Sequence, residues 1–372
     1  MGDWDTSPRD LTFRSSRRGS VRSVLCQRER HRLLDELGLR DRAGVQRGYG
    51  IAIALVVVVG VAMGATRLGR GSLSHVMDIL GRAQPGWLLV AVACFSIALL
   101  SSAAAWHAGL RACGGRACFT QVSARYAIGS LVNAVTPAHL GGAVRLALLS
   151  RTLPGVDRLW RAGGVGASVA GARTLALAVL VLAAASVGSV PVWPAPLLAG
   201  AVVAALVVCT RFSARAEGHL ASLLQIFRSY ARAPRAAANL IAWIGCSFAA
   251  RVGAATAVGM ALHVPQPLWV ALVLLASLAL AGVFPLTPGN FGTGAGAATL
   301  ALYGAGVDVA SSLALGLAFQ ALETAAATVL GLGGAAALAA PGTPARRWSL
   351  AAAGAAAVLV AATLGITSVD LV

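Results

Sequence analysis

The chain has 372 residues, of which 58% are hydrophobic and only 12% are charged, whereas soluble proteins carry about 25% charged residues. The apolar residues form long blocks that one water-soluble core could not hide, so the composition excludes a soluble protein and predicts an all-α, polytopic membrane protein. The chain has 30 arginines, no lysine and 13 acidic residues, which gives a net charge of +17. Such an excess is typical of proteins that bind nucleic acid or anionic lipid, and of membrane proteins whose positive loops stay on the cytoplasmic side.

Residues 1–47 form an arginine-rich arm with eleven arginines, seven acidic residues and no apolar run. The stretch 28–42 could form a short amphipathic helix. No apolar segment lies near the start of the chain, so we expect no signal peptide. We expect a disordered cytoplasmic arm whose arginines orient the first helix and contact anionic lipid, each contributing about 1 kcal/mol.

Residues 48–372 form the membrane domain. Seven apolar blocks are close to the ~20 residues that a bilayer-spanning helix requires. They are Gly48–Thr66, Gly86–His107, Gly163–Val190, Pro194–Thr210, Ala238–Leu262, Val309–Ala339 and Trp348–Ile366. Two further apolar regions, 121–151 and 268–303, are broken near the middle by proline and glycine. Each broken region could be a re-entrant hairpin of half-helices or a pair of spans.

The positions of the arginines in the loops predict the topology. Arginines occupy the loops near 111–116, 151–161, 211–235 and 346–347. The connections without arginine are 189–196, 263–267 and 304–308. Because arginine-rich loops stay in the cytoplasm, we expect a multi-pass protein of the bacterial plasma (inner) membrane with a cytoplasmic N-terminus. The loop 67–82, with three arginines, is one weak exception. These orientation signals account for most of the net positive charge. The sequence has no basic stripe with interleaved aromatic residues, so we expect no nucleic-acid partner.

Motifs of conventional catalysis and metal binding are absent from the sequence. It contains no GxxxxGK[ST] and no HExxH. Cys113 and Cys118 are the only close pair of cysteines, and no second pair completes a zinc site. Only six acidic residues follow Asp41. We therefore expect no cofactor, no metal and no catalytic residue, which makes an enzyme the less favoured class.

The two broken regions share a short motif. Aligned on Thr136-Pro137 and Thr287-Pro288, both read T-P-x-x-Φ-G, and Asn290 stands where His139 stands. An odd number of full spans separates the copies, so they face opposite sides, as in inverted repeats of transporters. Backbone groups freed by proline must face protein or a wet cavity. We therefore favour a mid-membrane cavity over two simple kinks, with helix N-termini suited to phosphate.

Charged residues within the apolar blocks mark candidate site residues. Arg125 and Arg145 flank the first break, and Arg173 and Arg251 lie inside full spans. Glu323 is the one acid well inside a span, and it could form a structural ion pair with Arg173 or Arg251. Four arginines against one glutamate leave a positive charge that an anionic lipid headgroup would balance, and the planar guanidinium suits phosphate.

The two motifs resemble those of the lysylphosphatidylglycerol synthase transmembrane region, or flippase-like, family of integral membrane proteins. The resemblance extends over residues 48–340. The family's first signature, N-x-x-x-P-G-R-x-G-E-x-x-R, is matched here at Asn133, Pro137, Gly141 and Arg145. Its second, P-x-x-P-G-G-x-G, is matched at Pro285, Pro288, Gly289 and Gly292.

This sequence departs from the family pattern at its acids. The resemblance implies carboxylates where Gly142, Ala172 and Ala295 stand, and an arginine near Gln320. If those acids serve ion coupling or headgroup selection in relatives, this protein works differently or takes a more acidic ligand. We expect no soluble domain after Val372 and therefore no aminoacyl-transferase activity of the kind fused to some relatives.

These observations predict a lipid translocase that binds an anionic headgroup at mid-membrane, between two inverted repeats. The lipid would be a phospholipid or a polyprenyl-phosphate glycolipid. The predicted ligand-binding residues are Arg125, Asn133, Pro137, His139, Gly141, Arg145, Arg173, Arg251, Pro285, Pro288, Gly289, Asn290, Gly292 and Glu323. Two alternatives stay open: a membrane transferase using a polyprenyl-phosphate-linked sugar, and a non-catalytic partner of an envelope-synthesis enzyme docked through the arm.

Overall fold

The computed structural model describes residues 76, 78–136, 140–186, 194–213, 218–281 and 291–363. Every regular element in these ranges is an α-helix. The helices are α4 (Pro85–Ala112), α5 (Phe119–Val135), α6 (Leu140–Ser150), α7 (Arg158–Ser186), α8 (Pro194–Ser213), α9 (Gly218–Arg232), α10 (Pro234–Ala261), α11 (Pro267–Ala281), α12 (Phe291–Gly304), α13 (Val309–Leu338) and α14 (Pro344–Thr363). The prediction of an all-α chain is confirmed for the described residues.

Four of these helices, α4, α7, α10 and α13, are long and apolar enough to cross a membrane. Each coincides with a block that the sequence predicts as a span, although α4, α7 and α10 each extend beyond at least one end of the apolar block. Thus α4 continues past His107 to Ala112, and α7 begins at Arg158 rather than at Gly163. Helices do not end where hydrophobicity ends, because a long arginine side chain can reach the interface from the last turn. The expected span Gly48–Thr66 and the arm 1–47 lie outside the described residues.

Both broken regions consist of two short helices each. The first contains α5, with 17 residues, and α6, with 11 residues. The second contains α11, with 15 residues, and α12, with 14 residues. All four are shorter than the ~20 residues of a full span. In each region the two short helices pack against each other.

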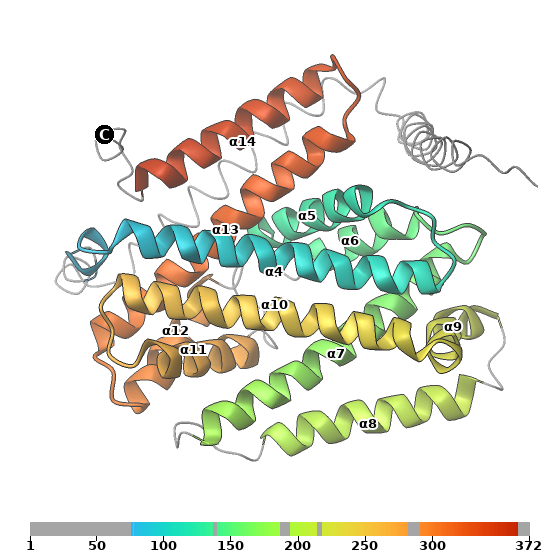
Figure 1. Ribbon diagram of the computed structural model, residues 1–372, viewed down its shortest axis with the longest axis horizontal. Coiled ribbons are helices and arrows are strands. Elements are labelled where there is room, and N and C mark those ends of the chain that lie inside the picture. Colours follow the sequence, from blue (N-terminus) through green and yellow to red (C-terminus); the bar gives the residue numbers. More distant parts are fainter. Residues whose placement is uncertain are drawn as a thin grey trace, which may run out of the picture.

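The two long helices α4 and α10 lie side by side along most of their length (Figure 1). Ser102 of α4 and Ser247 of α10 are hydrogen-bonded at 2.9 Å in the buried contact between them. Ser247 also donates to the carbonyl oxygen of Ala98 at 2.8 Å. Hydrogen bonds between serines are a common means of joining helices in membranes. Phe95 of α4 packs edge-on against Phe319 of α13, with ring centroids 4.9 Å apart.

Helices α5 and α13 approach each other closely at glycines. A Cβ atom on Gly334 would lie 2.7 Å from the carbonyl oxygen of Ala124, and one on Gly331 would lie 2.9 Å from that of Ala127. Contacts this short with backbone atoms exclude any larger residue at these two positions. Small residues at helix interfaces allow such approach in membranes. This packing fixes α5, which carries the centre of the site, against the long helix α13.

Candidate functional site

Tyr126 of α5 is the centre of a buried polar cluster. Its side chain is only 3% exposed, and its hydroxyl oxygen accepts a hydrogen bond from Nη2 of Arg173 on α7 at 2.9 Å. The guanidinium carbon of Arg145 on α6 lies 4.3 Å from the centre of the tyrosine ring. A guanidinium at this distance is attracted to the ring face. One tyrosine therefore positions two arginines from two other helices.

Serines complete the hydrogen bonds of this cluster. Arg173 also donates from Nη2 to Oγ of Ser102 on α4, at 3.1 Å. Arg145 donates from Nη2 to Oγ of Ser130 on α5, at 3.2 Å. The buried Nε of Arg145 has no hydrogen-bond partner among the described residues. The hydrogen bonds described for both arginines thus go to neutral hydroxyl groups, which hold the side chains without cancelling their charge.

Glu323 of α13 forms its ion pair with Arg251 of α10, at 2.6 Å. Of the two arginines that the sequence offers as its partner, the structure places Arg251 beside it. Arg173 takes Ser102 and Tyr126 as partners instead. The two side chains of the ion pair are 31% and 30% exposed. The pair joins α10 to α13 at the edge of the cluster.

The cluster has an excess of positive charge. Arg173 and Arg251 lie close enough to Arg145 for their charges to act on it, and Glu323 cancels the charge of Arg251. The other acids with described partners lie elsewhere. Asp157, in the loop before α7, contacts His219 of α9, and Asp308 caps the N-terminus of α13. Two guanidinium groups with neutral partners therefore remain around Tyr126. Such an arrangement can bind a phosphate or another anion.

Arg125 is buried on α5, with 3% of its surface exposed. It directly precedes Tyr126, and successive residues of an α-helix point about 100° apart. The contacts that join Arg145 and Arg173 to Tyr126 do not include Arg125. The structure therefore brings together Arg145, Arg173, Arg251 and Glu323 of the five predicted charged residues.

Two glycines, Gly141 of the first motif and Gly129 of α5, allow α6 to pack closely against α5. A Cβ atom on Gly141 would overlap Asn133, and one on Gly129 would lie 2.7 Å from Cβ of Arg145. The glycine of the signature therefore allows the close contact that places Arg145 beside Tyr126. Asn133 lies in the last turn of α5, next to this contact.

Of the remaining predicted site residues of the motifs, the structure describes one. Gly292 lies in the first turn of α12. The others fall outside the described residues: Pro137, His139, Pro285, Pro288, Gly289 and Asn290.

The three positions where the family pattern has acidic residues, Gly142, Ala172 and Ala295, differ in how deeply they are buried. Gly142 is exposed, and no described atom lies within 4 Å of a Cβ placed there. Ala172 packs against the apolar core, and Ala295 is only 3% exposed. Among the described residues, no group of three His, Cys, Asp or Glu side chains is arranged to hold a metal.

Sequence reasoning missed Tyr126 and the serines that hold the arginines. One signal for Ser102 is present, because Ser101 and Ser102 are adjacent polar residues in the middle of the apolar block 86–107. Tyr126 and Ser130 gave no such signal, because tyrosine and serine are ordinary residues of membrane helices. Only the packing of α4, α5, α6 and α7 shows which hydroxyl groups face an arginine.

A comparison with known protein families matches residues 49–331 to the lysylphosphatidylglycerol synthase transmembrane region. The chain belongs to this family. The match includes Tyr126, Arg145, Arg173, Arg251 and Glu323, so the whole cluster lies within the lysylphosphatidylglycerol synthase transmembrane region. A comparison with curated proteins finds no match. The family and the long apolar helices together make the chain a multi-pass membrane protein, consistent with a lipid-related role.

Proposed function

We propose that this protein is a lipid translocase that binds an anionic lipid headgroup at the cluster around Tyr126. One observation carries the proposal: Arg145 and Arg173 converge on Tyr126 with neutral hydrogen-bond partners. Uncompensated charge within apolar helices is costly and marks functional sites in membrane proteins. A lipid phosphate would balance the two charges and remove that cost.

The cluster is prepared for a phosphate before any ligand arrives. Tyr126, Ser102 and Ser130 fix the two guanidinium groups, so little side-chain entropy is lost on binding. The free Nε–H of Arg145 adds a hydrogen-bond donor without a described partner. Arg251, whose charge is cancelled by Glu323, lies at the edge of the cluster. Asn133, His139 and Asn290, together with Arg125, are further candidates for contacts with the headgroup.

Movement of the lipid would follow from the broken helices. Short helices that do not span the membrane can shift against long ones with less disruption of packing than full spans can. In this proposal one inverted repeat rocks against the other around the headgroup, which is held between Arg145 of α6 and Arg173 of α7. We place the protein in the bacterial plasma membrane, with its N-terminus in the cytoplasm and phospholipid or polyprenyl-phosphate glycolipid as substrate.

The test is lipid movement in proteoliposomes that contain fluorescent phosphatidylglycerol or fluorescent phosphatidylcholine. Arg145→Gln and Arg173→Gln should slow the movement of phosphatidylglycerol at least tenfold. Arg116→Gln, an exposed arginine of the loop after α4, is the matched control and should have no effect. Thermal unfolding of each variant in detergent confirms that it is folded. Unchanged movement of both lipids in the two cluster variants would overturn the proposal.

Deletion of residues 1–47 separates transport from a role as a docking partner. A translocase keeps its activity in proteoliposomes without the arm, because the cluster lies within the helices. Loss of all movement on deletion would contradict a self-contained translocase. Formation of a new glycolipid from a polyprenyl-phosphate sugar by the purified protein would favour a transferase instead.

A further inference from the structure

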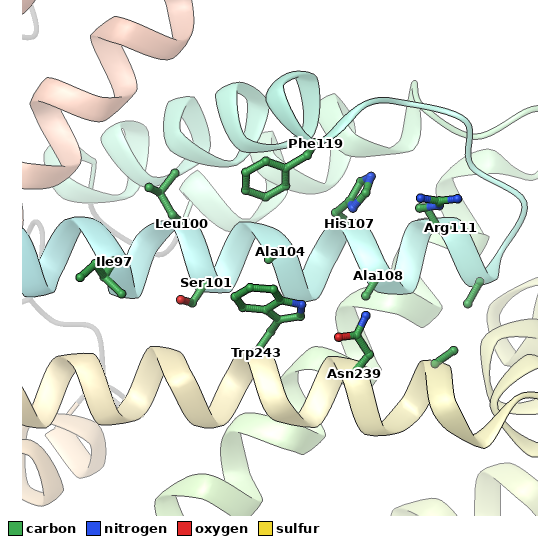
Figure 2. A pocket seen from close by; sticks show the side chains of 12 residues that line it. Ile97, Leu100, Ser101, Ala104, His107, Ala108, Arg111, Phe119, Asn239 and Trp243 are labelled. Carbon is green, nitrogen blue, oxygen red and sulfur yellow. The ribbon is translucent and has the colours of Figure 1, made fainter. Parts of the chain in front are cut away.

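A groove runs along the outer face of the α4–α10 pair, extending to the start of α5 (Figure 2). Its volume is about 850 Å³, and its lining is mostly apolar. Ser101 lines this groove, whereas its neighbour Ser102 contacts Arg173 in the cluster. The α4–α10 pair thus separates the groove from the arginine cluster, and the two are distinct sites.

One end of the groove is apolar and exposed. Ile97 and Leu100 of α4 are 49% and 42% exposed, and Trp243 of α10 is 39% exposed. These side chains belong to helices that are apolar enough to span a membrane, so their exposed surfaces suit a hydrocarbon chain.

The other end of the groove is polar and basic. His107, Arg111 and Asn239 line it, and Arg111 lies in the last turn of α4. His107 is fixed by a hydrogen bond of 3.2 Å from its Nε2 to the carbonyl oxygen of Ala117, and by edge-on contact with Phe119. No acidic residue lines the groove within the described part of the chain. The polar end therefore favours a negative group.

The spacing of the two ends suits a lipid. From Ile97 to Arg111 the helix rises ~21 Å, which is comparable with the length of a fatty acyl chain and fits within one half of a bilayer and its headgroup layer. In Figure 2, Trp243 lies between Leu100 and His107 along the groove, on the side of α10. An apolar helix of a second copy would cover Ile97 and Leu100 but would leave Arg111 without a counter-charge.

We propose that the groove binds one anionic glycerophospholipid of the surrounding bilayer, with its phosphate at Arg111 and Asn239 and an acyl chain along Ile97, Leu100 and Trp243. The site is separate from the cluster and does not rest on the proposed translocation. Charge complementarity selects the lipid: a phosphatidylglycerol headgroup carries a net negative charge that Arg111 balances, whereas phosphatidylcholine carries none.

The test measures quenching of tryptophan fluorescence by lipids with brominated acyl chains, added to the full chain in a non-ionic detergent. The difference between the unmodified protein and Trp243→Phe isolates the signal of Trp243. We expect brominated phosphatidylglycerol to quench Trp243 at several-fold lower lipid content than brominated phosphatidylcholine. Arg111→Gln should abolish this preference. Arg116→Gln, in the neighbouring loop and also exposed, should retain it.

Other outcomes overturn the proposal. Equal quenching by both lipids would show ordinary contact with the bilayer and no selective site. An equal loss in Arg111→Gln and Arg116→Gln would show that general surface charge is responsible. A dimer by native mass spectrometry in which neither lipid reaches Trp243 would assign the groove to a second copy. Arg173→Gln, which tests the cluster, should leave the preference at Trp243 unchanged, so the two proposals can fail separately.

Discussion

Arg251 of α10 and Glu323 of α13 form an ion pair of 2.6 Å beside the cluster around Tyr126. The pair cancels the charge of one arginine and leaves Arg145 and Arg173 with neutral partners. It also joins two long helices through groups that the apolar surroundings make costly to separate. Within this cluster the excess charge therefore belongs to the other two arginines.

Removal of one member of this pair should destabilise the protein. Glu323→Gln leaves the Arg251 guanidinium without its counter-charge, and we expect the free energy of unfolding to fall by about 1–3 kcal/mol, less than for a fully buried pair because both side chains are about a third exposed. Titration with denaturing detergent measures this. The double variant Arg251→Gln, Glu323→Gln should recover part of the loss. If the double variant is as unstable as the sum of the single variants, the two residues do not interact.

The hydroxyl group of Tyr126 should matter for ligand binding more than for folding. Tyr126→Phe removes one acceptor from Arg173 but keeps the ring that faces Arg145. Because Arg173 retains Ser102, we expect lipid movement to slow about fivefold; this corresponds to ~1 kcal/mol, less than the roughly 1.5–3 kcal/mol of a hydrogen bond to a charged group. The proteoliposome assay measures this effect. Tyr303→Phe, at an exposed position of α12, is the control, and an equal effect of both variants would contradict the role of Tyr126.

Replacement by alanine should affect the stability of the protein differently at two adjacent glycines of α6. Gly141→Ala introduces a methyl group into Asn133 and the backbone of Gly129, so α6 must move away from α5 and carry Arg145 with it. We expect a lower melting temperature and slower lipid movement. Gly142→Ala meets no described atom within 4 Å and should keep or slightly raise stability, because alanine favours a helix by about 1 kcal/mol over glycine. Equal melting temperatures for the two variants would refute this close contact.

Cys113, in the loop after α4, should react slowly with thiol reagents. Burial raises the pKa of its thiol to about 11, although the nearby Arg161 guanidinium opposes the shift. At pH 8 the thiolate fraction is then roughly a hundredfold below that of a thiol with the ordinary pKa of 9.0. Maleimide labelling followed by peptide mass spectrometry should show Cys118 labelled well before Cys113, with labelling of Cys113 rising steeply with pH. Equal rates for the two cysteines would contradict the burial of Cys113.

The sequence predicts the apolar helices of the described region, because each apolar block carries its own signal, but it gives residues 211–235 as a loop, where the structure has α9. The breaks at 121–151 and 268–303 were predicted for the same reason: proline and glycine interrupt a helix locally, whatever surrounds it. The ends of the helices were predicted less well. Ala112 of α4 and Arg158 of α7 lie outside the apolar blocks. Both helices include these residues because the membrane–water interface accepts polar side chains as well as helical backbone.

The candidate site was predicted in part. Charge inside an apolar block identified Arg145, Arg173, Arg251 and Glu323 without any structure, since burying a charge is costly wherever the helix packs. The pairing of Glu323 could not be chosen, because Arg173 and Arg251 are equally plausible partners until the faces of α7 and α10 are known. Tyr126 could not be found either, because its role arises from the meeting of three helices.

The consecutive residues Ser101 and Ser102 place two different contacts on one turn of α4. Ser101 faces the groove and contacts Cys246, at 3.4 Å, whereas Ser102 faces the cluster and contacts Ser247 and Arg173. Both serines belong to one rigid turn, so a twist of α4 about its axis moves both at once. The orientation of α4 about its axis therefore decides both which side chains line the groove and which hydroxyl group holds Arg173.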